Sequence, residues 1–392
     1  MRNVRIMTLS ECCEIVSGAT PKTSEDKYWH GEIPWTTPKD LSNLKSHYLE
    51  DTPRKITKLG LDSCGASVLP SGSVLFSSRA PIGHVAINSV PMATNQGFKS
   101  FIPKVGVIDA KFLFHWLKKN RNYLESLGNG ATFKEVSKTT VSRIEIALPP
   151  IDDQRRIAAL LDEVDALRAK RRDALRMLGG LTESIFFEMF GTLEKAYYGL
   201  PLVQLRDVTT RITDGTHLTP KFLNSGIPFI FVKNFHDGQV NFETDKFISE
   251  DEHTTLYKRC PVEKGDVLYT TVGATYGQAA IVGDFVKFAF QRHVAHLKPD
   301  VKKILPEFLG EVMKLSLVKK QADRWARGAA QPTLNLTELR NFEIPLPSFE
   351  RQHEFVKKAF VISKMKNAMV ASSSKLDILF ESLQSRAFLG EL

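Results

Sequence analysis

The feature that most constrains this chain is an internal repeat. At a shift of 198 residues, Leu148-Pro149 meets Leu346-Pro347, and the match runs without a gap to Phe190, which meets Phe388. Further upstream it continues through small insertions at shifts of 193 and 194. Chance matches would not keep both one register and apolar character over such a length. The sequence therefore predicts two copies of one unit of about 195 residues.

Each copy shows the same order of expected elements. A β-rich front part comes first, with short apolar runs between Gly and Pro turn residues. A short helix is expected over 109–123 and again over 305–322, followed by strands at 143–148 and 341–346. A long helix, opened by Pro-Pro or Pro-Ser, then closes each copy. The expected front domains are 1–149 and 192–347, and the expected long helices occupy 150–191 and 348–392.

Both long helices carry apolar residues at alternating spacings of three and four, the pattern of a coiled-coil seam. Because the first helix leads out of one copy and into the next, we expect the pair to be antiparallel, with a front domain at each end of a rod. The alternative is one amphipathic helix on each body, but about 36 residues would extend roughly 54 Å, longer than a small body needs. The predicted seam positions are Ile157, Leu160, Val164, Leu167, Leu178, Leu181, Ile185, Phe355, Ile362, Met365, Met369, Leu376, Leu379 and Leu383.

Composition narrows the class of protein. The chain is 42% hydrophobic and 25% charged, which is typical of a soluble globular protein. No run approaches the length of a membrane span and the N-terminus lacks a signal-peptide pattern, so we expect a cytoplasmic protein. Four cysteines are too few for a disulfide framework. A net charge of +9 favours a polyanionic partner.

Motifs for catalysis or metal binding are missing from the sequence. It has no phosphate-binding loop, no dinucleotide fingerprint and no nucleophile elbow. Leu148–Ile151 lacks the Asn or Asp and the aromatic residue of a base-methylating box. His293 and His296 have no third ligand at zinc spacing, so no metal is expected. Two alternatives remain. One is a methyltransferase or nuclease with its own reader, which a bound cofactor or activity in the purified chain alone would support. The other is a protein-binding scaffold, which salt-dependent DNA affinity would separate from a DNA reader.

Several segments point to one family. Residues 148–162, LPPIDDQRRIAALLD, closely resemble the opening of the long helix in specificity (S) subunits of type I restriction–modification systems. Residues 69–87 and 94–98 resemble the target-recognition-domain signature of that family, and residues 331–336 with the strand end at Pro347 match it in the second copy. The resemblance covers the whole chain.

The resemblance implies an α+β fold: a tandem repeat of two mixed α/β DNA-recognition domains joined by two long helices that form an antiparallel coiled coil. It implies a subunit without catalysis of its own that reads a bipartite, asymmetric DNA site with a fixed gap. Two methylating (M) subunits, which modify adenine, and two restriction (R) subunits would be its partners. S-adenosylmethionine, ATP and Mg would belong to those partners, and this chain would hold no cofactor.

The second copy departs from the family pattern in two places. No arginine equivalent to Arg79 occurs near 273–275, and residues 349–353 form a looser helix opening. Divergent front domains are expected if each copy reads a different sequence.

Loops at strand ends carry polar and basic side chains suited to phosphate positioning and base-edge readout. Lys22 and Lys39 are expected on phosphates. In the alternative interpretation Asn95 and Gln96 hold a turn and Arg79 pairs with an internal carboxylate. The candidate DNA-binding residues are Lys22, Lys39, Arg79, Thr94, Asn95, Gln96 and Lys99 in the first copy, and Lys233, Asn234, Thr275, Tyr276, Gln278, Gln291 and Arg292 in the second.

Overall fold

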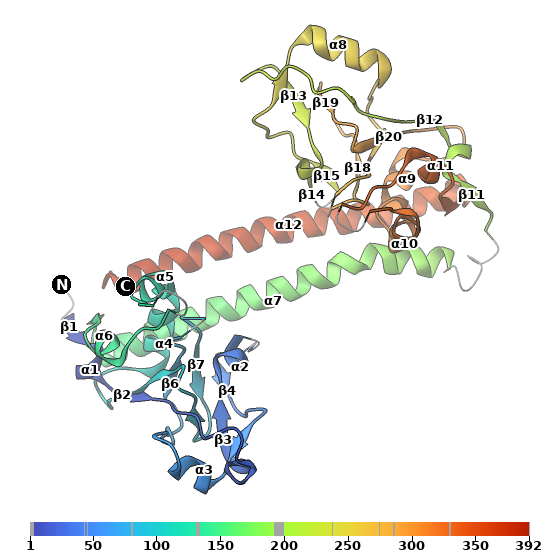
Figure 1. Cartoon of the computed structure of the whole chain (residues 1–392). Helices are drawn as coiled ribbons and strands as arrows, with labels where there is room; N and C mark the ends of the chain where they lie inside the picture. The colour runs from blue at the N-terminus through green and yellow to red at the C-terminus, as the bar shows by residue number, and fades with distance from the viewer. Residues whose placement is uncertain are drawn as a thin grey trace. The chain divides into compact units, whose positions relative to one another are not determined.

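The computed structural model describes residues 4–42, 44, 46–79, 81–130, 134–191, 200–236, 238–273, 275–284, 287–328 and 331–391. It combines helices and sheets (Figure 1). The chain forms two compact units. Unit 1 comprises Met1–Arg172 and Ala371–Leu392, and unit 2 comprises Asp173–Val370. Each unit therefore contains one β-rich domain and a part of each long helix.

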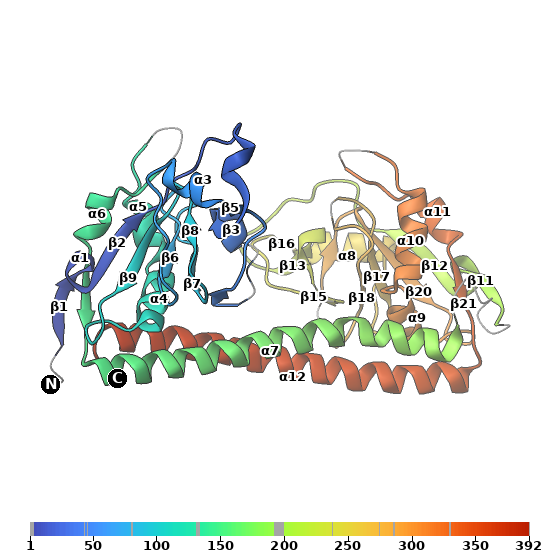
Figure 2. The ribbon, with the colours of Figure 1, turned by 90° about the horizontal axis from the view of Figure 1, so that it is seen from below.

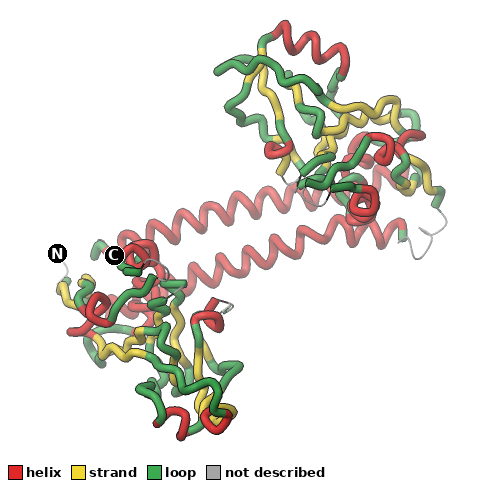
Figure 3. Tube along the Cα trace, in the orientation of Figure 1, coloured by secondary structure: helices red, strands yellow, loops and turns green. Residues whose placement is uncertain are grey.

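The β-rich domain of unit 1 is built on two main sheets. One has the strand order β2-β9-β6-β7-β4 and the other β5-β3-β8, while β1 pairs antiparallel with β10. Figure 3 shows strands in yellow and helices in red. The elements are β1 (Arg5–Thr8), α1 (Leu9–Cys12), β2 (Cys13–Ser17), η1 (Asp26–Tyr28), β3 (Trp29–Thr36), α2 (Pro38–Ser42), β4 (Tyr48–Leu49), β5 (Lys55–Ile56), α3 (Lys58–Asp62), β6 (Val74–Phe76), β7 (Val85–Asn88), β8 (Ala93–Thr94), β9 (Lys99–Pro103), α4 (Ala110–Lys119), α5 (Arg121–Ser126), α6 (Lys138–Ser142) and β10 (Glu145–Leu148).

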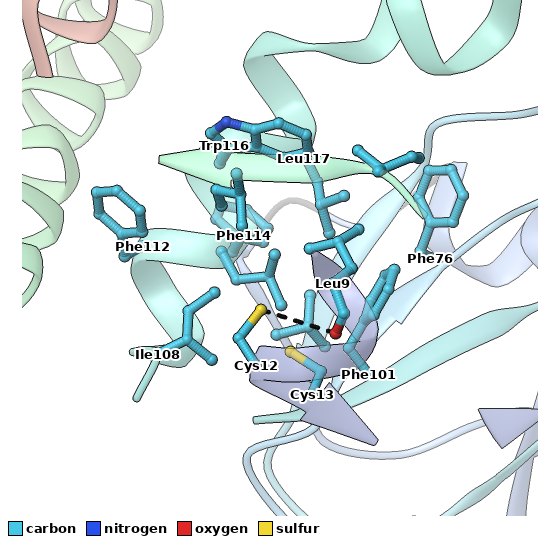
Figure 4. Close-up of a cluster of buried hydrophobic side chains, with 14 of the residues drawn as sticks. Leu9, Cys12, Cys13, Phe76, Phe101, Ile108, Phe112, Phe114, Trp116 and Leu117 are labelled. Carbon is cyan, nitrogen blue, oxygen red and sulfur yellow. Dashed lines mark hydrogen bonds between the residues drawn. The ribbon is translucent and has the colours of Figure 1, made fainter. Parts of the chain in front are cut away.

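The core of unit 1 lies between α4 and the larger sheet. Phe112 and Leu117 of α4 are buried with Phe76 and Phe101 of β6 and β9, and Leu9 of α1 packs among them (Figure 4). Burying an aromatic or leucine side chain contributes about 1.5–3 kcal/mol, so this cluster is a main source of the unit's stability.

The β-rich domain of unit 2 repeats this architecture. Its elements are β11 (Leu202–Gln204), η3 (Leu205–Asp207), β12 (Thr209–Asp214), β13 (Ile227–Ile230), η4 (Val232–Asn234), β14 (Phe235–His236), β15 (Gln239–Val240), β16 (Phe247–Ile248), α8 (Glu250–Arg259), β17 (Val267–Thr270), β18 (Ala279–Ile281), β19 (Ala289–Phe290), β20 (Val294–Pro299), α9 (Pro306–Val312), α10 (Ser316–Trp325), α11 (Leu336–Arg340) and β21 (Glu343–Pro345).

Strand orders confirm the internal repeat. The order β12-β20-β17-β18 matches β2-β9-β6-β7, and β16-β13-β19 matches β5-β3-β8. The pair β11-β21 matches β1-β10. In both smaller sheets the central strand pairs parallel with one neighbour and antiparallel with the other. The tandem arrangement predicted from the sequence is therefore present in the fold.

The long helices are α7 (Ile151–Phe190) and α12 (Phe349–Phe388). In unit 1, Arg168 of α7 contacts Asp377 and Phe380 of α12. In unit 2, the ring of Phe186 near the end of α7 packs against Phe355 near the start of α12. An early part of each helix thus meets a late part of the other, so the helices run antiparallel, as predicted (Figure 2).

Each long helix buries side chains against two neighbours, the β-rich domain and the other long helix. Leu161 and Val164 of α7 belong to the core of unit 1, together with Phe380 and Ala387 of α12, so the helices pack on the β-rich domain as well as on each other. Of the predicted seam positions, Ile157, Val164, Phe355 and Ile362 are buried, and Leu178, Ile185, Met369, Leu376 and Leu383 are half-buried. Leu160, Leu167, Leu181, Met365 and Leu379 are 39–49% exposed.

Equivalent glutamines fasten the start of each long helix. Gln154 is fully buried; its Oε1 accepts a hydrogen bond from Asp109 N at 2.9 Å, and its Nε2 donates to Val107 O and Pro149 O. Gln352 repeats this arrangement, since its Oε1 accepts from Leu305 N at 2.8 Å and its Nε2 donates to Pro347 O. The helix in each copy is thereby joined to the loop that precedes α4 or α9.

The short helices differ from the sequence prediction. Each expected helix is broken in two, because Asn120 separates α4 from α5, and residues 313–315 separate α9 from α10. Asn120 leaves the helical conformation and donates through Nδ2 to Trp116 O at 2.9 Å, a local bond that competes with continuing the helix. In the second copy Glu183 accepts a hydrogen bond from Ser316 N, where α10 begins anew.

Within the described part of the chain, no helix combines the length and the apolar character needed to cross a lipid bilayer.

Candidate nucleic-acid interface

Four of the predicted DNA-binding residues of the first copy line one open hollow. Lys39 comes from α2, Arg79 from the loop after β6, and Asn95 and Gln96 from the loop between β8 and β9. The hollow has a volume of about 540 Å³, and its other lining residues are Thr37, Pro38, Ser42, Pro81 and Gly97. We call it the reading hollow. It presents a guanidinium, an ammonium and two amides, groups that can bond base edges and phosphates.

Local hydrogen bonds hold the walls of the reading hollow. Asp40 accepts from Thr37 N at 2.7 Å, which fixes the start of α2 beneath Lys39. Asn95 Oδ1 accepts from Gly97 N at 2.9 Å, so this amide oxygen does hold a turn, as the alternative interpretation proposed. Gly18 lies under the same loop, where a Cβ would be 2.0 Å from Asn95 O. Only glycine allows this close approach.

Arg79 sits on a short connection between β6 and β7. Its backbone forms an isolated bridge with Glu135, and Ser77 Oγ donates to Pro81 O. Gly83 has φ +94°, a left-handed conformation that favours glycine and completes the tight turn between the two strands. Arg79 is half-buried at the rim of the reading hollow.

The remaining candidates of the first copy lie elsewhere. Thr94 and Lys99 are buried, with exposed fractions of 2% and 7%. Lys99 Nζ forms an ion pair with Glu135 at 3.1 Å, which gives this cation an internal partner. Lys22 is exposed and lies 3.4 Å from Glu25, outside the reading hollow.

In the second copy, Lys233, Gln291 and Arg292 occupy loops equivalent to those of the reading hollow. Lys233 is exposed in η4, and its Nζ lies 3.7 Å from Asp245. Arg292 is exposed and adjoins Gln291. Gly215 lies beneath, where a Cβ would be 2.6 Å from Gln291 O, repeating the arrangement at Gly18.

Asn234 is buried and has internal hydrogen-bond partners. Its Oδ1 accepts from Phe231 N, and its Nδ2 donates to Asn241 O and Glu243 O. The amide therefore serves the fold of the loop that presents Lys233.

The three candidates at 275–278 lie in the connection between β17 and β18. Thr275 is exposed, and the hydroxyl of Tyr276 donates to Asp323 of α10. Lys319 Nζ is 3.8 Å from the Tyr276 ring centroid, and its hydrogen bond lowers the pKa of Asp323. Gln278 lines a hollow against α7 and α12. Tyr276 and Gln278 therefore face α10 and the long helices.

The sequence analysis did not predict a partly buried ionic cluster. His115 Nε2 of α4 lies 2.8 Å from Asp162 Oδ1 of α7, and His47 Nε2 lies 3.0 Å from Asp165 Oδ2. Lys111 Nζ lies 2.8 Å from Asp162 Oδ2. These contacts join the β-rich domain to the long helix. The partners are remote in sequence, so no local motif indicates them.

Electrostatics in this cluster follow from its pairing. Hydrogen bonds to Asp162 and Asp165 raise the pKa of His47, whereas burial lowers the pKa of His115. Burial opposes ionisation of Asp162, but hydrogen bonds from His115, His47 and Lys111 outweigh it and lower its pKa far below the usual range. Ligand atoms of His47, His115 and Asp162 lie within 4.8 Å of one another. A metal ion there would have to compete with Lys111, so the geometry favours an ion-pair network.

His296 of the sequence motif is also accounted for by packing. His296 is fully buried, with Nε2 2.7 Å from Asp266 Oδ2 and Nδ1 3.2 Å from Cys260 Sγ. Both ring nitrogens therefore have neighbours within the domain.

Comparison with known proteins identifies the family. The model of the type I restriction modification DNA specificity domain matches residues 1–176 and 202–370. The chain belongs to this family. It is a specificity subunit of a type I restriction–modification system, a non-catalytic subunit with a DNA-recognition role, as the sequence resemblance implied.

The relatives of this specificity subunit cover most or nearly all of its length. The type I restriction enzyme MjaIX specificity subunit of Methanocaldococcus jannaschii is 29% identical, covering 99% of this chain and 93% of its own. The EcoBI specificity subunit of Escherichia coli is 27% identical, covering 78% of this chain and 70% of its own. The crystal structure of a type I S subunit from M. genitalium has the same fold, with a TM-score of 0.61 at 15% identity over 99% of this chain and 96% of that one. The predicted fold class is thereby confirmed.

Proposed function

We propose that this specificity subunit reads a bipartite, asymmetric DNA site, one half with each β-rich domain, across an unread gap of fixed length. The reading hollow carries the proposal. It gathers Lys39, Arg79, Asn95 and Gln96 from separate loops into one open surface. Arginine and amide side chains can bond guanine and adenine edges, and both arginine and lysine position phosphates.

The asymmetry of the site follows from divergence between the copies. The loops that present Lys39 and Arg79 in the first copy present Lys233 and no equivalent arginine in the second. Different side chains on a shared framework would read different bases. The fixed gap rests on α7 and α12, because each unbroken helix contributes residues to both units.

The long helices are also the proposed docking surface for partner subunits. Leu160, Leu167 and Leu181 of α7 and Met365 and Leu379 of α12 are apolar and 39–49% exposed, although the helices are otherwise rich in charge. We propose that two methylating subunits cover these residues and that two restriction subunits join them. S-adenosylmethionine, ATP and Mg would then be bound by the partners.

The deciding experiment is a methylome of cells that carry the complete system. We expect methylated adenines in two short, unlike sequences separated by a constant number of base pairs. Cells lacking the gene for this chain serve as the control and should lose that methylation. A single continuous motif, or a gap that varies between sites, would contradict the two-reader proposal. The mass of the co-expressed complex tests the expected ratio of two methylating subunits to one specificity subunit.

A further inference from the structure

A second hollow in unit 1 lies where the β-rich domain meets α7. It has a volume of about 530 Å³, and its basic lining residues are Lys118 of α4, Arg121 of α5, and Arg168 and Arg172 of α7. Asp165 is the acidic residue among its described lining. We call it the junction hollow. Its lining carries an excess of positive charge and so favours an anion.

The junction hollow adjoins the reading hollow. Ser42 at the end of α2 lines both of them. The turn after Arg79 also separates them, with Pro81 on the reading side and Gly83 on the junction side. Arg121 lies across this turn, because a Cβ at Gly83 would be 2.6 Å from Arg121 Cγ. A polyanion bound along the reading hollow would therefore have cationic side chains beside it.

The cations of the junction hollow differ in how firmly they are paired. Arg168 is held by Asp165 at 3.0 Å and Asp377 at 2.6 Å and serves the packing of the helices. Arg121 is 4.0 Å from Glu125 and its side chain is 45% exposed. Arg172 is exposed and has no ion-pair partner among the described residues. Arg121 and Arg172 are thus the arginines best able to bind an external group.

The second copy has an equivalent hollow with a different charge. It lies against α12 and contains Gly277, Lys314 and Lys366 at positions that match Gly83, Lys118 and Arg168 in the repeat. Glu183 and Glu311 also line it, and Lys314 Nζ is 2.7 Å from Glu311 Oε1.

Charges in this second hollow balance. Lys319 takes the place of Arg121, since a Cβ at Gly277 would be 2.7 Å from Lys319 Cδ, but Lys319 is paired with Asp323 and lies over the Tyr276 ring. The position that matches Arg172 holds Val370. The same surface therefore exists twice in the chain, and only the copy in unit 1 has a net positive lining among its described residues.

We propose that the junction hollow binds a backbone phosphate of DNA, through Arg121 and Arg172, next to the half-site read by the first copy. This inference rests on the proposed reading of DNA by that copy. A guanidinium offers two parallel N–H donors to phosphate oxygens, and neutralising a phosphate releases bound counterions. The long helix thereby takes part in DNA binding, at one half-site and not at the other.

The test compares charge-matched variants of the full chain, purified with its partner subunits, on a duplex of random sequence. Arg121→Gln combined with Arg172→Gln removes the proposed contacts. Lys170→Gln is the control on the same helix: Lys170 is exposed, but two residues of helix turn it to the other side of α7. Lys314→Gln is the control in the equivalent hollow of the second copy. Melting temperatures establish that every variant is folded.

We expect the double variant to bind the duplex about tenfold more weakly, and the slope of log affinity against log salt to fall by about two units. Both control variants should keep the wild-type slope. Arg172→Lys should retain most of it, because the charge is kept. Ethylation of phosphates on a recognised site should interfere with binding at an additional phosphate beside the first half-site, and this interference should vanish in the double variant.

Two results would overturn the inference. One is a double variant whose salt slope equals that of Lys170→Gln. The other is a double variant that binds DNA normally but loses a partner subunit, which would show that the hollow binds an acidic protein surface. Failure of the proposed function itself gives a different outcome, because the wild-type complex would then prefer no duplex sequence over any other.

Discussion

Nε of Arg168 lies 2.6 Å from Oδ1 of Asp377, and the Arg168 guanidinium also lies 4.3 Å from the centroid of the Phe380 ring. One residue of α7 therefore holds two residues of α12 within unit 1. Arg168 is only 20% exposed, so the ion pair is partly shielded from solvent and from salt.

Replacing Arg168 by Gln should lower the free energy of unfolding by about 1–2 kcal/mol, because the ion pair and the ring contact are both lost. Asp377→Asn should cost about 1 kcal/mol or less, since the ring contact remains. A double-mutant cycle followed by urea denaturation measures the coupling between the two residues. Strictly additive effects would mean that the ion pair contributes nothing.

Gln154→Ala should destabilise the first copy by about 2–3 kcal/mol, because three hydrogen bonds are lost and buried backbone groups are left without partners. Gln352→Ala, the equivalent change, should act similarly on the second copy. Gln321→Ala provides a control, since this glutamine bonds at a partly exposed site. Hydrogen exchange localises each effect; a loss of protection that spreads equally through both units would contradict the copy-specific role.

Val164→Asp should cost about 3 kcal/mol or more, because Val164 is 6% exposed and a carboxylate there has lost its solvent. Leu160→Asp should cost about 1 kcal/mol or less, since Leu160 is 39% exposed. Thermal unfolding of both variants distinguishes packing from partner docking. Leu160→Asp should keep its melting temperature yet weaken assembly with the methylating subunit, and an unaltered assembly would remove this residue from the docking surface.

Stability of unit 1 should fall as the pH rises above neutrality. The pKa of His47 is raised by its bonds to Asp162 and Asp165. Its contribution is therefore complete below its unfolded value of about 6.5 and is lost as the pH rises through the higher folded pKa. His47→Gln should flatten the decline in melting temperature between about pH 6.5 and 8.5. His236→Gln, a change at an exposed histidine, should keep the wild-type profile.

Stability of unit 1 should also fall in acid, through the two carboxylates of the same cluster. The pKa values of Asp162 and Asp165 are lowered in the folded state. Their contribution is present above their unfolded value of about 3.9 and is lost as the pH falls through the lower folded values.

Arg79→Ala separates base reading from phosphate binding. If Arg79 reads a guanine edge, the change should cost about 1–3 kcal/mol on the specific site and relax preference at one position of one half-site. If it binds a phosphate, affinity should fall equally for all sequences and the salt slope should shrink by about one unit. We expect the phosphate outcome: the second copy lacks this arginine but would still need a phosphate anchor, which Lys233 or Arg292 could supply. Unchanged binding by a folded variant would remove Arg79 from the interface.

The repeat and the antiparallel helices could be predicted because they depend on patterns that persist along the sequence. Gln154 and Gln352 make equivalent buried hydrogen bonds. Residues that match in the sequence repeat therefore also occupy equivalent positions in the fold. Contacts between residues remote in sequence could not be predicted in this way. Nothing near His47 indicates Asp165, and nothing near Lys99 indicates Glu135.

The candidate site residues show the same contrast between what a local sequence pattern predicts and what depends on the fold. Four of the residues predicted from strand-end loops line the reading hollow, but a one-dimensional pattern does not say which polar side chains of a loop turn inward. Asn234 adjoins the exposed Lys233, but its side chain is hydrogen-bonded to three backbone groups of the domain. Predicted heptad positions have a similar ambiguity, because a helix that packs on both a domain and another helix buries more than one stripe.

Phe380 and Ala387 of α12 complete the core of unit 1, although the rest of that unit ends at Arg172. On the ribosome these segments are separated by the whole of unit 2. At about 5–20 residues per second, roughly 10–40 s pass between them. Unit 2 is continuous in sequence and can fold within that interval, whereas the domain synthesised first waits with part of its apolar core uncovered. Unit 2 is therefore able to complete its fold before unit 1, although most of unit 1 is synthesised first.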